Sequence, residues 1–147
     1  MPGTNSNTVL YATRAASLPA VNIPSGTINT TYTLITTGAA TYGSVITDLL
    51  FRSADSNTRN FDIIICATGS QATAENARVQ VSIAASSGNN GTTAIASLAS
   101  MVPALFDVDL AGNRVIGLEA GQSIYVKCTT TTAGAIFVTV KQRDYTP

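Results

Sequence analysis

The chain has 147 residues, a length typical of one domain that can bury a hydrophobic core without disulfide or metal support. Charged residues make up only 11% of it, and 8 basic and 8 acidic residues give a net charge of zero. Because phosphate binding needs clustered Lys and Arg, this composition argues against nucleic acid as a partner, whereas a neutral surface is compatible with packing against other proteins.

The sequence shows no secretion signal and no membrane span. It does not open on a basic region followed by an apolar run, and no stretch approaches the ~18 apolar residues of a membrane span. We therefore expect no membrane partner and synthesis in a reducing cytosol. Cys66 and Cys128 either pair or act as two buried thiols, and a cytosolic product favours buried thiols.

Residues 1–25 differ from the rest of the chain, because Pro2, Pro19 and Pro24 interrupt any regular pattern. Only residues 8–13 fit a short strand. One interpretation is a frayed terminus. The other is an extended N-terminal arm that docks on a neighbouring subunit through four apolar contact residues: Val9, Leu10, Tyr11 and Leu18.

Period-two alternation of apolar residues begins after the arm. It predicts strands at 27–35, 44–52, 60–67 and 77–84. Both faces of the strand at 44–52 are largely apolar, which favours a central position, and Asp48 and Arg52 share a face on which they can pair. Polar loops at 53–58, 68–76 and 86–91 separate the strands, and this spacing is typical of a sandwich or barrel.

Residues 91–105 fit two structures. Ile95, Leu98, Val102 and Leu105 form a helical stripe, and Pro103 would end a short helix. One strand followed by an extended connection fits the same residues, and both alternatives stay open.

The last third of the chain has the strongest strand pattern. It predicts a strand at 106–110, an apolar run at 115–118, and a hairpin of strands 122–128 and 135–143. In the first hairpin strand Ile124, Val126 and Cys128 share one face. In the second strand Ile136, Val138 and Val140 share one face. The residues as a whole predict one antiparallel β-sandwich of jelly-roll type at 26–147, preceded by the arm at 1–25.

The sequence offers little chemistry for catalysis. It contains no histidine, which removes the commonest general base and metal ligand, and no nucleophile elbow or phosphate loop. Asp48, Asp62 and Asp107 could in principle meet in a glycosidase cleft, but their spacing does not demand it. We therefore predict that the chain is not an enzyme and has no catalytic residue and no cofactor.

A calcium loop is the one metal site that the sequence suggests. Residues 107–113 begin like such a loop, with acids at positions one and three and glycine at six. The match then fails at Ala111 and Leu118, so a half-exposed strand that ends in a turn is favoured, and no metal is predicted.

Five turn-and-strand motifs point to a family. The Thr-rich segment 32–39 ends in Thr-Gly-Ala and leads into Gly43-Ser44-Val45-Ile46, and Leu49 to Arg52 follow. Near the end come the turn and strand Leu118-Glu119-Ala120-Gly121-Gln122-Ser123-Ile124 and the closing Arg143-Asp144-Tyr145. Over about residues 30–66 and 106–145, this order resembles a group of small virion proteins from tailed bacteriophages.

The resemblance implies a capsid decoration, or cement, protein on the outer surface of the capsid. Its partners would be the major capsid protein and further copies of itself, since such proteins are small β-sandwiches that oligomerise, often as trimers. The alternative is a receptor- or glycan-binding module of a head or tail fibre, which would use the three polar loops. A hydrolase is the third class, and the missing histidine argues against it.

Overall fold

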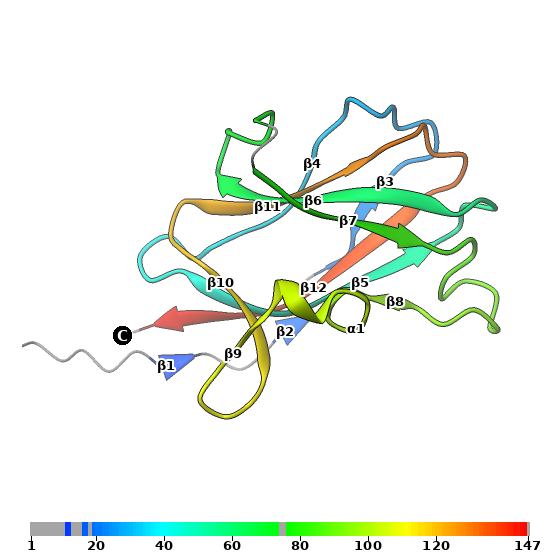
Figure 1. Ribbon diagram of the computed structural model, residues 1–147. Coiled ribbons are helices and arrows are strands. Elements are labelled where there is room, and N and C mark those ends of the chain that lie inside the picture. Colours follow the sequence, from blue (N-terminus) through cyan, green and yellow to red (C-terminus); the bar gives the residue numbers. More distant parts are fainter. Residues whose placement is uncertain (1–10, 13–15, 18, 74–75, 147) are drawn as a thin grey trace, which may run out of the picture.

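Two antiparallel β-sheets pack face to face in the computed structural model, which describes residues 11–12, 16–17, 19–73 and 76–146 (Figure 1). In the larger sheet the long β12 (Ile136–Thr146) pairs with β5 (Ser44–Ser53), and β5 pairs with β10 (Arg114–Leu118). The smaller sheet has the order β4-β11-β6-β7, with bounds Thr33–Thr37, Gln122–Cys128, Arg59–Ala67 and Ala77–Ile83.

The order of the principal strands is that of a jelly roll. β3 (Val21–Ile23) pairs with β12 on the side away from β5, which gives the larger sheet the order β3-β12-β5-β10. Along the chain, every step between principal strands except β6 to β7 passes from one sheet to the other. The predicted antiparallel β-sandwich of jelly-roll type is therefore confirmed.

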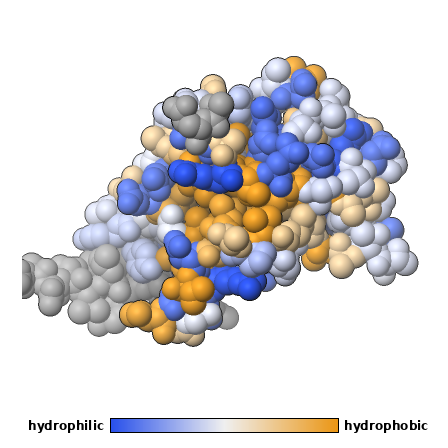
Figure 2. All heavy atoms as spheres, viewed as in Figure 1, coloured by the Kyte–Doolittle hydropathy of each residue, from blue (hydrophilic) through white to orange (hydrophobic). Residues whose placement is uncertain are grey.

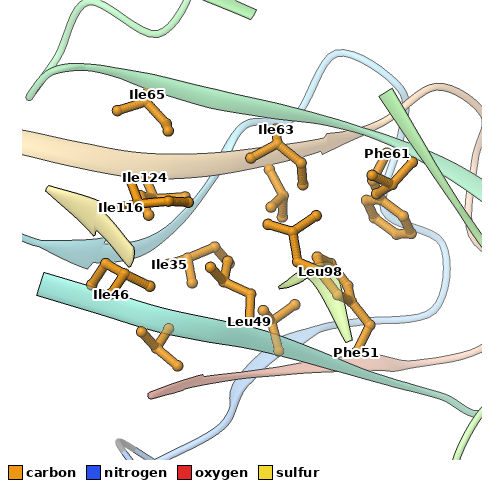
Figure 3. Close-up of a cluster of buried hydrophobic side chains, with 14 of the residues drawn as sticks. Ile35, Ile46, Leu49, Phe51, Phe61, Ile63, Ile65, Leu98, Ile116 and Ile124 are labelled. Carbon is orange, nitrogen blue, oxygen red and sulfur yellow. The ribbon is translucent and has the colours of Figure 1, made fainter. Parts of the chain in front are cut away.

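Alternation along the strands places one set of apolar side chains between the sheets (Figure 3). Phe51 from β5 and Phe61 from β6 are fully buried, and the centroids of their tilted rings are 5.9 Å apart. Burying a side chain of this kind stabilises a fold by about 1.5–3 kcal/mol. The same core contains inward residues that the alternation predicts, among them Ile63, Ile65, Val81, Ile83, Ile124, Val126, Cys128, Ile136, Val138 and Val140.

The predicted hairpin of strands 122–128 and 135–143 is wrong. β11 pairs with β4 and β6 in the smaller sheet, whereas β12 pairs with β3 and β5 in the larger one. The connection between β11 and β12 crosses from sheet to sheet, and its Thr132 backbone bonds Gly26 and Thr27 of the N-terminal loop. Alternation shows which residues face the core but not which strand lies alongside, so both arrangements satisfy the same pattern.

Two other predicted strands are shorter than the pattern indicates. The strand expected at 27–35 is β4, and it begins only at Thr33. Two turns precede it, closed by hydrogen bonds from Thr27 N to the Pro24 carbonyl and from Thr31 N to the Ile28 carbonyl. The strand expected at 106–110 is only β9 (Asp107–Val108), which pairs with β10.

Both alternatives for residues 91–105 contribute to the structure. β8 (Ala96–Ser97) pairs with β5, and then α1 (Leu98–Met101) and a 3₁₀ turn (Pro103–Leu105) follow. Leu98 is fully buried in the core, and Val102 and Leu105 are partly buried and pack against this core, whereas Ile95 is exposed. In the described ranges no helix is long and apolar enough to cross a membrane.

The described part of the N-terminal arm lies along β12. β1 (Tyr11–Ala12), β2 (Ala16–Ser17) and β3 pair with successive stretches of β12, and Ile23 of β3 is 1% exposed in the core. The last residues of the predicted arm are therefore part of the larger sheet, while the boundary between arm and domain at residue 25 stays a prediction.

Cys66 and Cys128 are free and buried, as the buried-thiol interpretation predicts. They belong to different apolar clusters. Cys128 lies in the core between the sheets, and Cys66 packs with Ile64 and Tyr125 in a smaller cluster.

A buried ion pair fastens the end of the sandwich at which β5 ends and β6 begins. Asp55 is fully buried and accepts hydrogen bonds from Arg59 Nε at 2.7 Å, Asn57 N at 2.9 Å and Ala133 N at 2.7 Å. Burial alone would raise the pKa of this carboxyl, but the hydrogen bonds from Arg59 and from the backbone lower the pKa far below its usual range. Asp55 therefore stays charged and joins the loop after β5 to the loop before β12.

Gly134 makes this junction possible, because a Cβ there would lie 2.5 Å from the Ala54 carbonyl oxygen and 2.6 Å from the Asp55 nitrogen. We expect Gly134→Ala to lower the free energy of unfolding by about 1–3 kcal/mol through overpacking. Gly117→Ala is the matched control, because a Cβ at Gly117 would meet no atom within 4 Å. Urea unfolding of both variants measures the difference, and equal stabilities would contradict the prediction.

Candidate functional site at one end of the sandwich

The structure describes one of the four predicted contact residues. Tyr11 lies in β1, where its backbone pairs with Thr146, and Ala12 pairs with Tyr145. Val9, Leu10 and Leu18 lie outside the described residues. β1 therefore marks one end of the sandwich, the end at which β12 finishes and β5 begins.

The segments that carry the family resemblance meet at this same end. The Ser44 hydroxyl donates to Asp144 Oδ1 at 2.6 Å and accepts from Ala39 N at 2.9 Å. Gln142 donates to Asp144 Oδ1 at 2.7 Å and to the Ser44 hydroxyl at 3.2 Å, and it accepts from the Thr36 hydroxyl. One polar cluster thus joins β4, β5 and β12 across the two sheets.

The turn between β10 and β11 completes this end. Gly38 donates its N–H to the Gln122 carbonyl at 2.9 Å. A Cβ on Gly38 would overlap the Glu119 carbonyl oxygen, and a Cβ on Gly43 would overlap the Leu118 carbonyl oxygen. Gly38 and Gly43, which come from the first two motifs, are therefore needed for the close approach of the motif that begins at Leu118. This close approach explains why the motifs contain glycine.

An apolar cleft opens beside the polar cluster. It has a volume of about 540 Å³ and lies between β10 and β6, with apolar side chains from Ile65, Leu105, Ile116 and Leu118. Arg78 and Glu119 are exposed at this cleft. Figure 2 shows hydrophobic surface gathered between the two sheets, bounded by hydrophilic residues. The arrangement can bury apolar groups of a partner, and we define these six residues as the cleft.

The hairpin of β9 and β10 projects from the larger sheet as a yellow loop in Figure 1. We call residues 107–114 the knob. Leu110 at its tip is fully exposed and Val108 is 68% exposed. The sequence predicted a strand here, and neither residue was recognised as a contact candidate.

The Asp109 carboxylate organises the turn of the knob. It accepts hydrogen bonds from Ala111 N at 2.9 Å and from Asn113 N at 2.8 Å, while Asn113 Nδ2 donates at 3.2 Å. The Asn113 backbone N–H is the main cause of the lowered pKa of Asp109, to which Ala111 and the charge of Arg143 add. This is the strand-then-turn arrangement favoured above over a calcium loop.

Two of the three carboxylates of the hydrolase hypothesis, Asp48 in β5 and Asp62 in β6, lie on different sheets and have other partners. Asp48 accepts from the Ser97 hydroxyl at 2.7 Å and from Ala99 N at 3.0 Å, rather than pairing with Arg52 as the sequence suggested. Asp62 pairs with Lys127 at 3.5 Å. In the part of the chain that the structure covers, no three Cys, Asp or Glu side chains gather as metal ligands. The prediction that the chain is not an enzyme stays a prediction.

The three loops proposed for glycan binding lie at opposite ends of the sandwich. Loops 53–58 and 86–91 meet near Asp55, where Ser86 N donates to the Asp55 carbonyl at 3.0 Å. Loop 68–76 follows β6 at the other end, where Thr68 N donates to the Gly121 carbonyl at 2.9 Å. The three loops therefore do not form one binding surface.

Comparison with known proteins gives one structural similarity. No family model matches the chain, and no curated protein matches its sequence. A solved structure, a chain of the cyanophage Pam1 capsid asymmetric unit, is similar to it with a TM-score of 0.44 and 17% sequence identity, over 100% of both chains.

Proposed function

We propose that this chain is a structural protein of a phage virion, and specifically a capsid decoration protein. It binds the outer surface of the capsid and stabilises the shell by bridging copies of the major capsid protein. The alternative role, a receptor- or glycan-binding fibre module, needs loops that act together.

The observation that carries this proposal is the convergence of the motifs. Segments from three regions that resemble phage virion proteins, residues 32–46, 118–124 and 143–145, lie far apart in the sequence. They nevertheless join one polar cluster and one set of close backbone contacts around Ser44, Gly38 and Asp144. Motifs that matched by chance would have no reason to depend on one another in space. Their mutual contacts support a shared fold and therefore the resemblance.

The proposed action is mechanical. Apolar residues at the surface, among them Tyr42, Ile95 and Leu110, are available for burial against neighbours. A specific contact between proteins covers about 1,200–2,000 Å² in total, and many such contacts across adjacent shell subunits would raise the barrier to rupture by packaged DNA.

The first experiment counts copies of the protein on capsid-sized particles sedimented from a native lysate. We expect a copy number that scales with the shell protein. A handful of copies per particle would favour a fibre or tail role, and recovery only in the soluble fraction would overturn the virion proposal.

The N-terminal arm gives a second test on the same particles. A deletion of residues 1–10 removes Val9 and Leu10 but leaves β3 and its buried Ile23 in place. If the arm docks, we expect occupancy to fall by about tenfold or more, which corresponds to the loss of about 1.4 kcal/mol of binding free energy. The control is Leu34→Ala on β4, and unchanged occupancy of the deletion variant would contradict a role of the arm.

A further inference from the structure

The knob is built as a rigid apolar projection. Asp109 holds its turn through both carboxylate oxygens, and Gly112 N donates back to the Asp109 carbonyl at 2.9 Å. This turn presents Leu110 with its whole side chain in solvent. Because the turn is already ordered, a partner that buries Leu110 loses little conformational entropy in doing so.

The cleft has the matching chemistry. Its apolar side chains come from β6, β10 and the 3₁₀ turn, and its volume of about 540 Å³ exceeds that of a leucine side chain. It also lies beside the edge of β10 that β9 leaves unpaired, since β9 pairs only with Arg114 and Val115. The cleft therefore offers apolar contacts and backbone groups together.

Charges on the two surfaces are complementary. Asp107 and Arg114 are exposed where the knob joins the sheet, and Arg78 and Glu119 are exposed at the cleft. None of these four residues takes part in the ion pairs found among the described residues, which join Asp55 to Arg59 and Asp62 to Lys127. Each surface thus presents one exposed acid and one exposed base to the other, while Asp109 of the knob is engaged in its own turn.

We propose that the knob of one copy docks in the cleft of a second copy. Within one chain the two surfaces lie at opposite ends of β10, and the exposure of Leu110 shows that the knob does not fill its own cleft. A contact between two different surfaces is heterologous and leads to a closed ring or an open filament. This contact is a property of the chain itself and does not rest on the capsid proposal.

Cysteine cross-linking of the full chain tests the contact directly. Leu110→Cys and Gly117→Cys are made in separate chains that carry tags of different mass, then mixed and oxidised. Gly117 also lines the cleft, so the mixed disulfide joins the knob of one copy to the cleft of another, and its mass separates it from either homodimer. The native cysteines are buried, and a Cβ at Gly117 meets no other atom. We expect at least about tenfold more of the mixed dimer than with Leu34→Cys and Gly117→Cys, because a disulfide needs Cα atoms within about 7 Å. Equal yields would overturn the proposal.

Sedimentation of uncross-linked variants identifies the occupant. We expect Leu110→Asp to weaken self-association at least about tenfold, as for a central contact residue, and Leu34→Asp to leave it unchanged. Arg78→Glu combined with Asp107→Arg should restore the association that each change weakens alone. A monomer at every soluble concentration would overturn the proposal. If deleting residues 1–10 abolishes the association while Leu110→Asp leaves it unchanged, the cleft binds the N-terminal arm. That result would also overturn the proposal.

Discussion

Replacing Asp55 by Asn is expected to lower the free energy of unfolding by about 3–5 kcal/mol, the usual cost of breaking a buried ion pair on one side. The amide removes the charge that faces Arg59 and places a donor where Arg59 Nε or Ala133 N now donates. Urea unfolding at neutral pH measures the loss. Asp62→Asn is the matched control, because the Asp62–Lys127 pair is 21% and 26% exposed and its loss should cost under about 1 kcal/mol. Equal effects at the two sites would contradict the prediction.

The effect of Asp55→Asn should depend on pH in one direction. The pKa of Asp55 is lowered in the folded state, so the unfolded chain takes up the proton first as pH falls. The stabilisation is complete above the ordinary pKa of about 3.9 and shrinks below it by about 1.4 kcal/mol per pH unit. The wild type and the variant should therefore converge in stability in acid. A constant difference from pH 7 to pH 2.5 would contradict this assignment.

The second large effect is expected in the core. Phe51→Ala should cost about 3–5 kcal/mol, because it removes a fully buried ring and leaves a cavity beside Phe61. Phe137→Ala is the control, since Phe137 is half-buried on the outer face of β12 with Arg52 at 5.2 Å from its ring centre. That contact is worth about 0.5–1 kcal/mol at an exposed site. Similar losses at the two positions in urea unfolding would contradict the packing described here.

The fold was predictable to the extent that it depends on side-chain period. Ile136, Val138 and Val140 alternate with polar residues, and all three are buried as expected. The partner of each strand was not predictable, because pairing is decided by contacts between segments far apart. β12 shows this directly, since Gly134 in the predicted hairpin turn and Ala135 at the start of the predicted strand both contact the loop after β5.

The candidate site was only partly visible in the sequence. Gln142 occupies the next inward position after Val140 and is buried. A polar residue at an inward position of a strand is a sequence signal for a buried polar cluster. The knob gave a weaker signal. Val108 and Leu110 alternate like core residues, and only the short pairing of β9 places them in solvent. The structure explains the motif glycine Gly38, because a Cβ there would overlap the Glu119 carbonyl oxygen.

The position of β12 has a consequence for synthesis. This strand follows all the others in the chain, yet it lies in the middle of the larger sheet and holds β3 and β5 on its two sides. While the ribosome still covers residues 136–146, β3 has no neighbour and one edge of β5 is open. The larger sheet can therefore close only after translation has passed these residues, and its closure joins segments more than a hundred residues apart. Pairing of distant segments is slow compared with local contacts, so the edge of β5 that β12 covers stays exposed until this late step.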